Sequence, residues 1–286
     1  MIIEPKLLPV PKLQGYLQGA VAPRPIAFVS SMDKAGQVNL SPFSFFNMFS
    51  MNPPILVFSP SRRVRDNSTK HTLQNVLEVP EVVINIVSYS MVEQASLASC
   101  EFPKGTNEFL KAGFTAIDSQ MVKPPRVAES PVSFECKVNQ VIPLGKEGGA
   151  GNLVVCEVLL MHIRDEVLDE QGKIDPQKLD AVARMGQDYY CRAQGPNIFV
   201  VPKPNEKIGM GYDQIPEKIR NSRILTGNDL GRLGNLEKLP ERRAIEEFQK
   251  QDEWKAAARG GMDDLHRLAH HYLKIGRVED AWKILL

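Results

Sequence analysis

Residues 59–72 gather hydroxyl, amide and basic side chains, which are the groups that bind an anion. In chain order they are Ser59, Ser61, Arg62, Arg63, Arg65, Asn67, Ser68, Thr69, Lys70 and Thr72. A helix start offers free amides and the positive end of the helix dipole, and a lysine adds a full charge. With Asn67, Ser68 and Thr69 as helix-start residues, the segment predicts a phosphate site around Lys70. The alternative is that the arginines form a solvated basic loop.

A second polar stretch, SPFSFFNMFS at 41–50, mixes hydroxyls and an amide with phenylalanines. In extended or turn conformation, Ser41, Ser44, Asn47 and Ser50 could hydrogen-bond the polar atoms of a ligand while aromatic side chains pack against its apolar part. We expect most of the phenylalanines to lie in the core or at a subunit interface.

Short runs rich in β-branched and aromatic residues must position these groups. Residues 26–31, 37–40, 55–59 and 82–87 predict strands, with a hairpin turn at DKAG around Gly36. Residues 132–163 predict a long hairpin; a strand follows its glycine-rich turn, which disfavours a phosphate-cradling loop. Ser90 and Glu93 match a capping box before a helix over 91–99. Because strands and helices do not alternate regularly, the pattern predicts a mainly β fold, an antiparallel sheet closed into a barrel.

The composition changes near Pro204, and two stretches with helical spacing follow, at 241–261 and 263–286. We therefore expect domains at 1–204 and 205–286, the second a helical extension. Residues 263–286 look like a single tetratricopeptide-type helical hairpin, which must dock on the barrel or on a partner. His266 and His270 have the spacing of a helical zinc pair but lack a third ligand, so we expect a solvated helix face and no metal site.

The charge balance excludes several classes of partner. Lysine and arginine total 35 against 34 acidic residues, so no global field draws in nucleic acid or an anionic membrane. A nucleic-acid-binding barrel remains a remote alternative, resting on the basic 61–71 segment and interleaved aromatics. The sequence shows neither a secretory signal nor a membrane-spanning stretch, and its four cysteines form no CxxC pair. We expect a cytoplasmic protein with reduced thiols.

Residues 23–72 carry a set of motifs in a fixed order: PRPIAFVSS, NLSPFSFFN, NPPILVFSPS and KHT. In this order and spacing they resemble the flavin reductase-like, FMN-binding split-barrel family, over roughly residues 10–200. The resemblance implies a six-stranded antiparallel Greek-key split β-barrel with peripheral helices, bound FMN, and a homodimer with FMN near the subunit interface. It also implies NADH or NADPH as a transient donor that needs no Rossmann domain.

The resemblance also assigns residues. It places Arg24 and Pro25 near the flavin ring, where a cation stabilises the reduced, anionic form. Lys70 and Thr72 match the family's Lys-Asp-Thr element on the phosphate side, although His71 replaces its aspartate. His162 is implied as a catalytic residue beside the flavin or nicotinamide; a hydrogen-bonded structural histidine is the alternative.

The segment ARMGQDYYCRAQG resembles the family's Arg-x-Gly-Gly-x-x-Tyr element. Gln187 stands at the second glycine, and Tyr189 or Tyr190 is a candidate lid residue. Together these features predict an NAD(P)H-dependent flavin reductase that passes electrons to a small-molecule acceptor or a partner oxygenase. The alternative is a non-catalytic FMN electron carrier or redox sensor.

Overall fold

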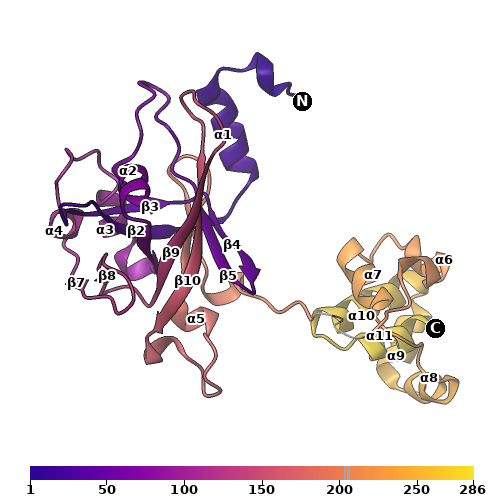
Figure 1. Cartoon of the computed structure of the whole chain (residues 1–286). Coiled ribbons are helices and arrows are strands. Elements are labelled where there is room, and N and C mark those ends of the chain that lie inside the picture. The colour runs from indigo at the N-terminus through magenta and orange to yellow at the C-terminus, as the bar shows by residue number, and fades with distance from the viewer. Residues whose placement is uncertain (203, 205–206) are drawn as a thin grey trace. The chain divides into compact units, whose positions relative to one another are not determined.

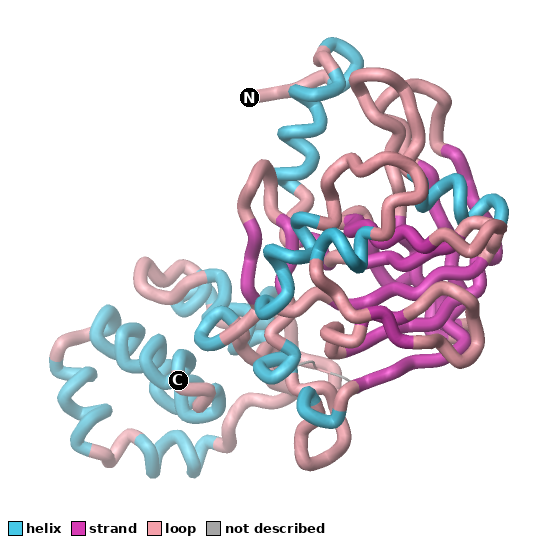
Figure 2. Tube along the Cα trace, turned by 90° about the vertical axis from the view of Figure 1, so that its left-hand side faces the viewer, coloured by secondary structure: helices cyan, strands magenta, loops and turns pink. Residues whose placement is uncertain are grey.

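The computed structural model describes residues 1–202, 204 and 207–286. The chain forms two compact units, Met1–Phe199 and Val200–Leu286, so the division lies a few residues before the expected boundary at 204. The first unit is mainly β, with its strands side by side and short helices and long loops around them (Figures 1 and 2). Its helices are α1 (Val10–Ala20), α2 (His71–Glu78), α3 (Val92–Leu97), α4 (Glu108–Ala112) and α5 (Pro176–Leu179).

The main sheet has seven strands in the order β3-β2-β6-β9-β10-β5-β4, and all neighbours pair antiparallel. Their bounds are β2 (Ala27–Met32), β3 (Val38–Phe43), β4 (Phe46–Met51), β5 (Pro54–Phe58), β6 (Glu81–Ile86), β9 (Val132–Pro143) and β10 (Asn152–Ile163). The predicted strands and both hairpins are confirmed.

The expected closure of the sheet into a barrel is wrong, because the edges of the seven-stranded sheet do not pair within the described residues. The mainly β fold is confirmed, and the six-stranded Greek-key topology of a split barrel stays a prediction. The edge strands β3 and β4 follow one another in the chain, joined by Ser44 and Phe45. This two-residue link joins the two edge strands in the chain, although no backbone hydrogen bonds pair one edge strand with the other.

The two faces of the sheet enclose different cores. One cluster includes Val29, Phe43, Phe58, Ile84 and Cys156, with α2 packed against it. The other includes Phe28 and Leu40 and packs against α3 and α4. Alternation along β3 therefore sends Asn39, Ser41 and Phe43 to the first face and Leu40 to the second.

The tip of the β9–β10 hairpin packs against the loop after β5. A Cβ on Gly148 would lie 3.0 Å from the backbone oxygen of Arg63, so a larger residue here would push the two backbones apart. The amide of Arg62 donates to the oxygen of Ala150, and the amide of Gly149 donates to the oxygen of Arg62. The glycine-rich turn thus serves to position the 61–70 loop.

A small second sheet joins β1 (Arg24–Pro25), β11 (Val182–Arg184) and β12 (Tyr190–Arg192). It brings together the Arg-Pro and ARMGQDYY segments, which are far apart in the sequence. Gln187 has φ 53° at the position where the family carries glycine. The turn therefore keeps the left-handed conformation without its usual residue. The two-stranded pair β7 (Ala116–Ile117) and β8 (Arg126–Val127) completes the unit.

Two predicted helix starts need correction. Ser90 and Glu93 do not form a capping box: a 3-10 turn over Tyr89–Met91 precedes α3, and the hydroxyl of Ser90 contacts that of Ser88 at 3.0 Å. Helix α2 begins at His71 with Lys70 as its N-cap, so Asn67, Ser68 and Thr69 lie before the helix.

The second unit contains α6 (Glu217–Arg220), α7 (Gly227–Gly234), α8 (Arg242–Phe248), α9 (Asp252–Arg259), α10 (Met262–Lys274) and α11 (Val278–Leu285). Leu233, Leu273 and Trp282 form its buried centre. The α10–α11 hairpin therefore packs on helices of its own unit, contrary to the expectation that it must dock elsewhere.

The solvated face expected for His266 and His270 is also wrong. His266 is buried, and Nδ1 of His270 lies 2.8 Å from Oδ2 of Asp229 in α7. Both histidines lie on the same stripe of α10 as Ala269 and Leu273, which points into the core. Within the described residues, no three His, Cys, Asp or Glu side chains are placed to hold a metal ion. No helix among them is long and apolar enough to cross a membrane.

Candidate functional site

A pocket lies between edge strand β3, the start of α2 and the loop 98–102. Its lining is Asn39, Ser41, Arg63, Lys70, His71, Thr72, Ala98, Ser99, Cys100, Glu101, Phe102 and Glu108. Nδ2 of Asn39 donates to Oγ1 of Thr72 at 2.9 Å and ties β3 to the first turn of α2. The structure thus brings together Ser41, Lys70 and Thr72, three of the residues predicted from sequence; the pocket is called the Lys70 pocket below.

Lys70 supplies an unused positive charge to this pocket. Its ammonium makes no hydrogen bond or ion pair with any described residue, and it lies 6.0 Å from the centre of the Phe43 ring. Burial lowers the pKa of Lys70, and Arg63 lowers it further, whereas Glu101 acts in the opposite direction. No side chain caps α2, so no capping group competes with an anion for the first amides of the helix that Lys70 precedes. The arrangement fits a phosphate group.

The neighbouring arginines are already engaged. Arg62 donates from Nε to Oδ1 of Asn67 at 2.6 Å and from Nη2 to its backbone oxygen at 2.7 Å. Arg63 pairs with Glu101 at 3.0 Å and donates to the Ser68 hydroxyl at 2.9 Å. Arg65 is exposed and also pairs with Glu101. The arginines thus brace the loop, and the predicted contact of Arg62 with a phosphate stays a prediction.

Ser68 and Thr69 serve the same loop. The Ser68 hydroxyl donates to Oδ1 of Asp66 at 2.6 Å, and its hydrogen bonds, with those of Arg65, lower the pKa of Asp66 to about 2. Oγ1 of Thr69 accepts from Gln74 at 3.2 Å. Their predicted contacts with a cofactor stay predictions, since their side chains already have partners.

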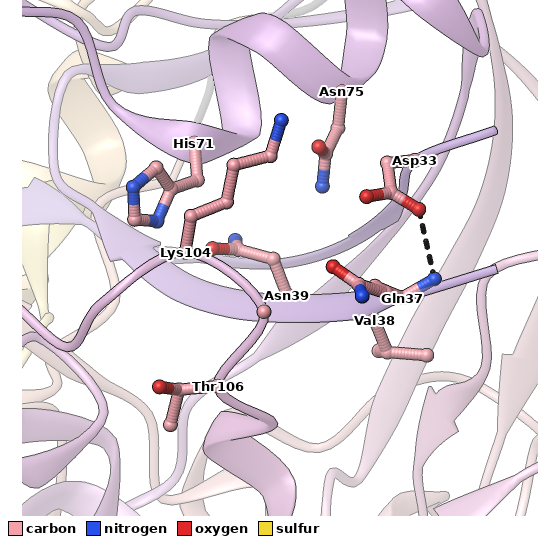
Figure 3. Close-up of a pocket in the computed structure, with 9 residues that line it drawn as sticks. Asp33, Gln37, Val38, Asn39, His71, Asn75, Lys104 and Thr106 are labelled. Atoms are coloured by element: carbon pink, nitrogen blue, oxygen red, sulfur yellow. Dashed lines mark hydrogen bonds between the residues drawn. The ribbon is translucent and has the colours of Figure 1, made fainter. Parts of the chain in front are cut away.

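A second pocket adjoins the first and is drawn in Figure 3. It is lined by Asp33, Gln37, Val38, Asn39, His71, Asn75, Lys104, Gly105 and Thr106, and is called the Lys104 pocket below. The two pockets share Asn39 and His71. The view shows the Lys104 side chain between those of His71 and Asn75. Sequence reasoning assigned no role to Asn39 or Lys104, because their segments are separated from Lys70 along the chain.

Glu108 is a buried acid in the wall of the Lys70 pocket. Its Oε2 accepts the backbone amide of Leu40 at 3.0 Å, so it satisfies a donor on the open edge of β3. Burial raises the pKa of Glu108, with the amide bonds opposing this shift. Asn107 caps α4 through the amide of Phe109 and fixes the position of Glu108. Sequence reasoning assigned no role to Glu108. An asparagine at the N-cap position 107 is the one local feature that could have marked it as the first residue of a helix.

The remaining polar candidates spread over β4 and the end of β5. Ser59 is buried beside the hairpin tip, and Ser61 follows it. Ser44 links β3 to β4, while Asn47 and Ser50 lie on edge strand β4. Oδ1 of Asn47 accepts the amide of Met48 at 2.8 Å. These five residues do not line either pocket, so their predicted cofactor contacts stay predictions.

Arg24 has a different environment from the one implied by the resemblance. Its side chain is buried, and its guanidinium donates to the backbone oxygens of Gln18, Val21 and Met185. It thereby joins α1, β1 and the turn after β11. Its Nε has no partner among the described residues, and the Phe45 ring lies 6.0 Å away. These contacts make Arg24 and its neighbour Pro25 part of the scaffold, and a role at the flavin ring stays a prediction.

His162 lies far along β10 from the phosphate-side residues. Val154 of β10 pairs with Phe58 at the end of β5, and His162 comes eight positions later, about 26 Å along an extended strand. Its Nε2 lies 2.6 Å from Oε1 of the buried Glu135. The structure therefore shows the hydrogen-bonded histidine considered from sequence and does not bring it to Lys70 in the same chain.

Residues 20–179 match the family described as flavin reductase like domain. The chain belongs to this family. Among curated relatives, an uncharacterised protein from Aquifex aeolicus is 41% identical over 177 residues, covering 62% of this chain and 88% of that protein.

Two solved structures align with most of the first unit of this chain. Nitrilotriacetate monooxygenase component B from Bacillus cereus aligns with a TM-score of 0.65 at 28% identity, covering 70% of this chain and 98% of that chain. The 2-nitrobenzoate 2-nitroreductase NbaA from Pseudomonas fluorescens aligns with a TM-score of 0.60 at 29% identity, covering 71% and 96%. The family match ends before the second unit, so the helical extension is not part of the flavin reductase-like domain.

Proposed function

We propose that this flavin reductase-like chain binds FMN by its phosphate in the Lys70 pocket and catalyses NADH- or NADPH-dependent flavin reduction. The observation that carries the proposal is the half-buried ammonium of Lys70, which lacks a partner among the described residues. A buried cation of this kind is costly without an anion beside it. Ser41, Thr72 and the first turn of α2 supply further donors around the same space.

FMN would supply the redox chemistry, accepting a hydride from the nicotinamide ring. The chain's own task is to hold the phosphate, fix the register of the ring and exclude water. The phosphate is held at Lys70, and the loop that carries it is braced by Arg62 and Arg63. Electrons then pass to a small-molecule acceptor or a partner oxygenase. The similarity to a monooxygenase component and a nitroreductase supports both kinds of acceptor.

Edge strand β4 supports the proposal of a homodimer. Met48, Phe49 and Met51 are each more than half exposed on this strand, and Phe45 precedes them. An exposed, apolar edge strand favours pairing with another chain. A second copy placed here would cover the aromatic stretch that contains Asn47 and Ser50, and would bring further groups to the flavin ring.

The test is anaerobic reduction of the FMN-loaded protein. We expect NADH or NADPH to bleach the visible absorbance of the bound flavin. Bleaching only by a reduced protein donor would favour the electron-carrier alternative. Failure of the purified chain to retain or bind FMN would reject the cofactor and with it the proposed function.

A further inference from the structure

A buried hydrogen bond joins edge strand β3 to the first turn of α2 inside the Lys70 pocket. Nδ2 of Asn39 donates to Oγ1 of Thr72 at 2.9 Å. Only 8% of Asn39 and 1% of Thr72 is exposed, and both residues line the pocket together with Lys70. Thr72 lies two positions after Lys70 at the start of the helix, so this bond fixes a side chain beside the unused charge.

The direction of this bond decides what the threonine can do. An amide nitrogen only donates, so Oγ1 of Thr72 acts as the acceptor and its own hydrogen must point elsewhere. No described residue accepts a hydrogen bond from the Thr72 hydroxyl. Because Thr72 lines the Lys70 pocket, this hydrogen is available to a ligand that occupies the pocket.

The acids of the pocket do not take this hydrogen. Oε2 of Glu108 accepts a backbone amide of β3. Glu101 is exposed and pairs with two arginines of the 61–70 loop. Neither carboxylate accepts from the Thr72 hydroxyl in the part of the chain that the structure describes. The hydroxyl hydrogen and the Lys70 ammonium are therefore two donors left to a ligand of the same pocket.

A second asparagine makes the same kind of bond away from the Lys70 pocket. Nδ2 of Asn75 in α2 donates to Oγ of Ser31 in β2 at 3.1 Å, and both residues are buried. Asn75 lines the Lys104 pocket, and Ser31 lines neither pocket. Since Asn75 already ties α2 to the sheet, the bond at Asn39 differs from it by the position of its hydroxyl beside Lys70.

We propose that Asn39 is a positioning residue, which directs the Thr72 hydroxyl hydrogen toward a phosphate oxygen beside Lys70 and so makes the site select phosphorylated flavins. The inference rests on the proposed phosphate site and deepens it. A hydroxyl whose oxygen is held by an amide keeps its hydrogen for an acceptor, and a hydrogen bond to an ionised oxygen is about twice as strong as one to a neutral oxygen. Asn39 itself does not touch the phosphate, because it acts through Thr72.

A double-mutant cycle tests this role. Calorimetric titration gives the affinities for FMN and riboflavin of the parent chain, Asn39→Ala, Thr72→Val and the double variant. We expect Asn39→Ala to lower FMN affinity about fivefold and to leave riboflavin affinity within about twofold. In the Thr72→Val background, where no hydroxyl remains to orient, Asn39→Ala should change neither affinity further. Thr72→Ser keeps the hydroxyl, so FMN affinity in this background should again depend on Asn39.

Asn75→Ala is the matched control, because it removes the corresponding bond to Ser31 and leaves the lining of the Lys70 pocket unchanged. It should lower thermal stability about as much as Asn39→Ala, with the ratio of FMN to riboflavin affinity unchanged. Three results would overturn the positioning role: unchanged FMN affinity in Asn39→Ala, an equal loss for both flavins, or the same loss of FMN affinity with and without the Thr72 hydroxyl. Absence of FMN binding in the parent chain would overturn the proposed function itself.

Discussion

Nε2 of His162 lies 2.6 Å from Oε1 of Glu135, across the β9–β10 pair. Glu135 is completely buried and also accepts the amides of Gln120 and Met121. This relationship makes His162 a partner of a buried carboxylate, whereas the family resemblance implies a catalytic residue.

We therefore predict that His162→Ala destabilises the first unit by about 2 kcal/mol, because it removes one partner of a buried acid. Flavin reduction by NADH should stay within about twofold of the parent rate. Urea unfolding followed by circular dichroism measures the first quantity, and stopped-flow bleaching of bound FMN the second. A large loss of rate with unchanged stability would restore the catalytic role.

The same acid predicts a pH dependence of stability. Burial by itself would raise the pKa of Glu135, but the amides of Gln120 and Met121 and the contact with His162 outweigh it and lower the pKa. A carboxyl with a lowered pKa in the folded state stabilises the fold above its unfolded pKa and loses this effect as pH falls through the folded pKa. We expect the unfolding free energy of Glu135→Gln to fall less steeply with decreasing pH than that of the parent chain. If the unfolding free energy falls with decreasing pH as steeply as in the parent chain, other groups cause the acid dependence.

We predict that a substitution at Arg24 lowers the stability of the first unit without changing FMN binding. Arg24→Lys keeps a charge, but a single ammonium cannot satisfy three carbonyl groups in the positions occupied by a guanidinium. We expect a loss of about 2 kcal/mol in the unfolding free energy, with FMN affinity unchanged at temperatures where the variant is folded. Preserved stability combined with weaker FMN binding would instead place Arg24 at the flavin.

The cysteines should differ sharply in reactivity. Cys136 and Cys156 are buried in the sheet core, and burial raises the pKa of both thiols. Cys100 is exposed and lines the Lys70 pocket. Alkylation read by peptide mass spectrometry should modify Cys100 first and reach Cys136 and Cys156 only in denaturant. Bound FMN should slow the reaction at Cys100, and labelling of the core cysteines in native buffer would contradict the described packing.

The helical unit carries its own spectroscopic probe, because Trp254 and Trp282 are the only tryptophans of the chain and both lie in it. Thr226 caps α7, Asp229 completes the capping box by accepting the Thr226 amide, and the Asp229 carboxylate also pairs with His270. We expect Asp229→Ala to lower the unfolding free energy reported by tryptophan fluorescence by about 2 kcal/mol. An unchanged fluorescence transition would show that the cap and the ion pair contribute little.

Local patterns predicted the strands well. The DKAG turn and the 132–163 hairpin depend on residues close in sequence, and both are confirmed. The pairing of β6 between β2 and β9 is non-local and leaves no trace in the spacing. The capping box at Ser90 failed because a 3-10 turn precedes the helix, and the exposure of His266 and His270 was misjudged because their core is built by other helices.

The candidate site shows the same limit. The KHT motif already singles out Lys70 in the sequence, and the fold adds that Arg62 and Arg63 have partners while the lysine has none among the described residues. Lys104 lies in a loop that no motif marks, and Glu108 is the first residue of the short helix α4; both line the pockets beside β3. Sequence therefore indicated Lys70 and its segment, and the tertiary contacts show which other residues line the pocket around it.

The preference of the protein for FMN over riboflavin tests the central claim most directly, since the two ligands differ only in the phosphate. Isothermal titration calorimetry of the parent chain, Lys70→Ala and Lys70→Arg with both flavins gives the ratio of FMN affinity to riboflavin affinity for each protein. The preference should decline as pH rises through the pKa of Lys70, and in Lys70→Arg it should persist to higher pH because arginine stays charged. We predict that Lys70→Ala loses at least about tenfold in FMN affinity and leaves riboflavin affinity unchanged. Equal FMN affinity in the parent chain and Lys70→Ala would contradict the account.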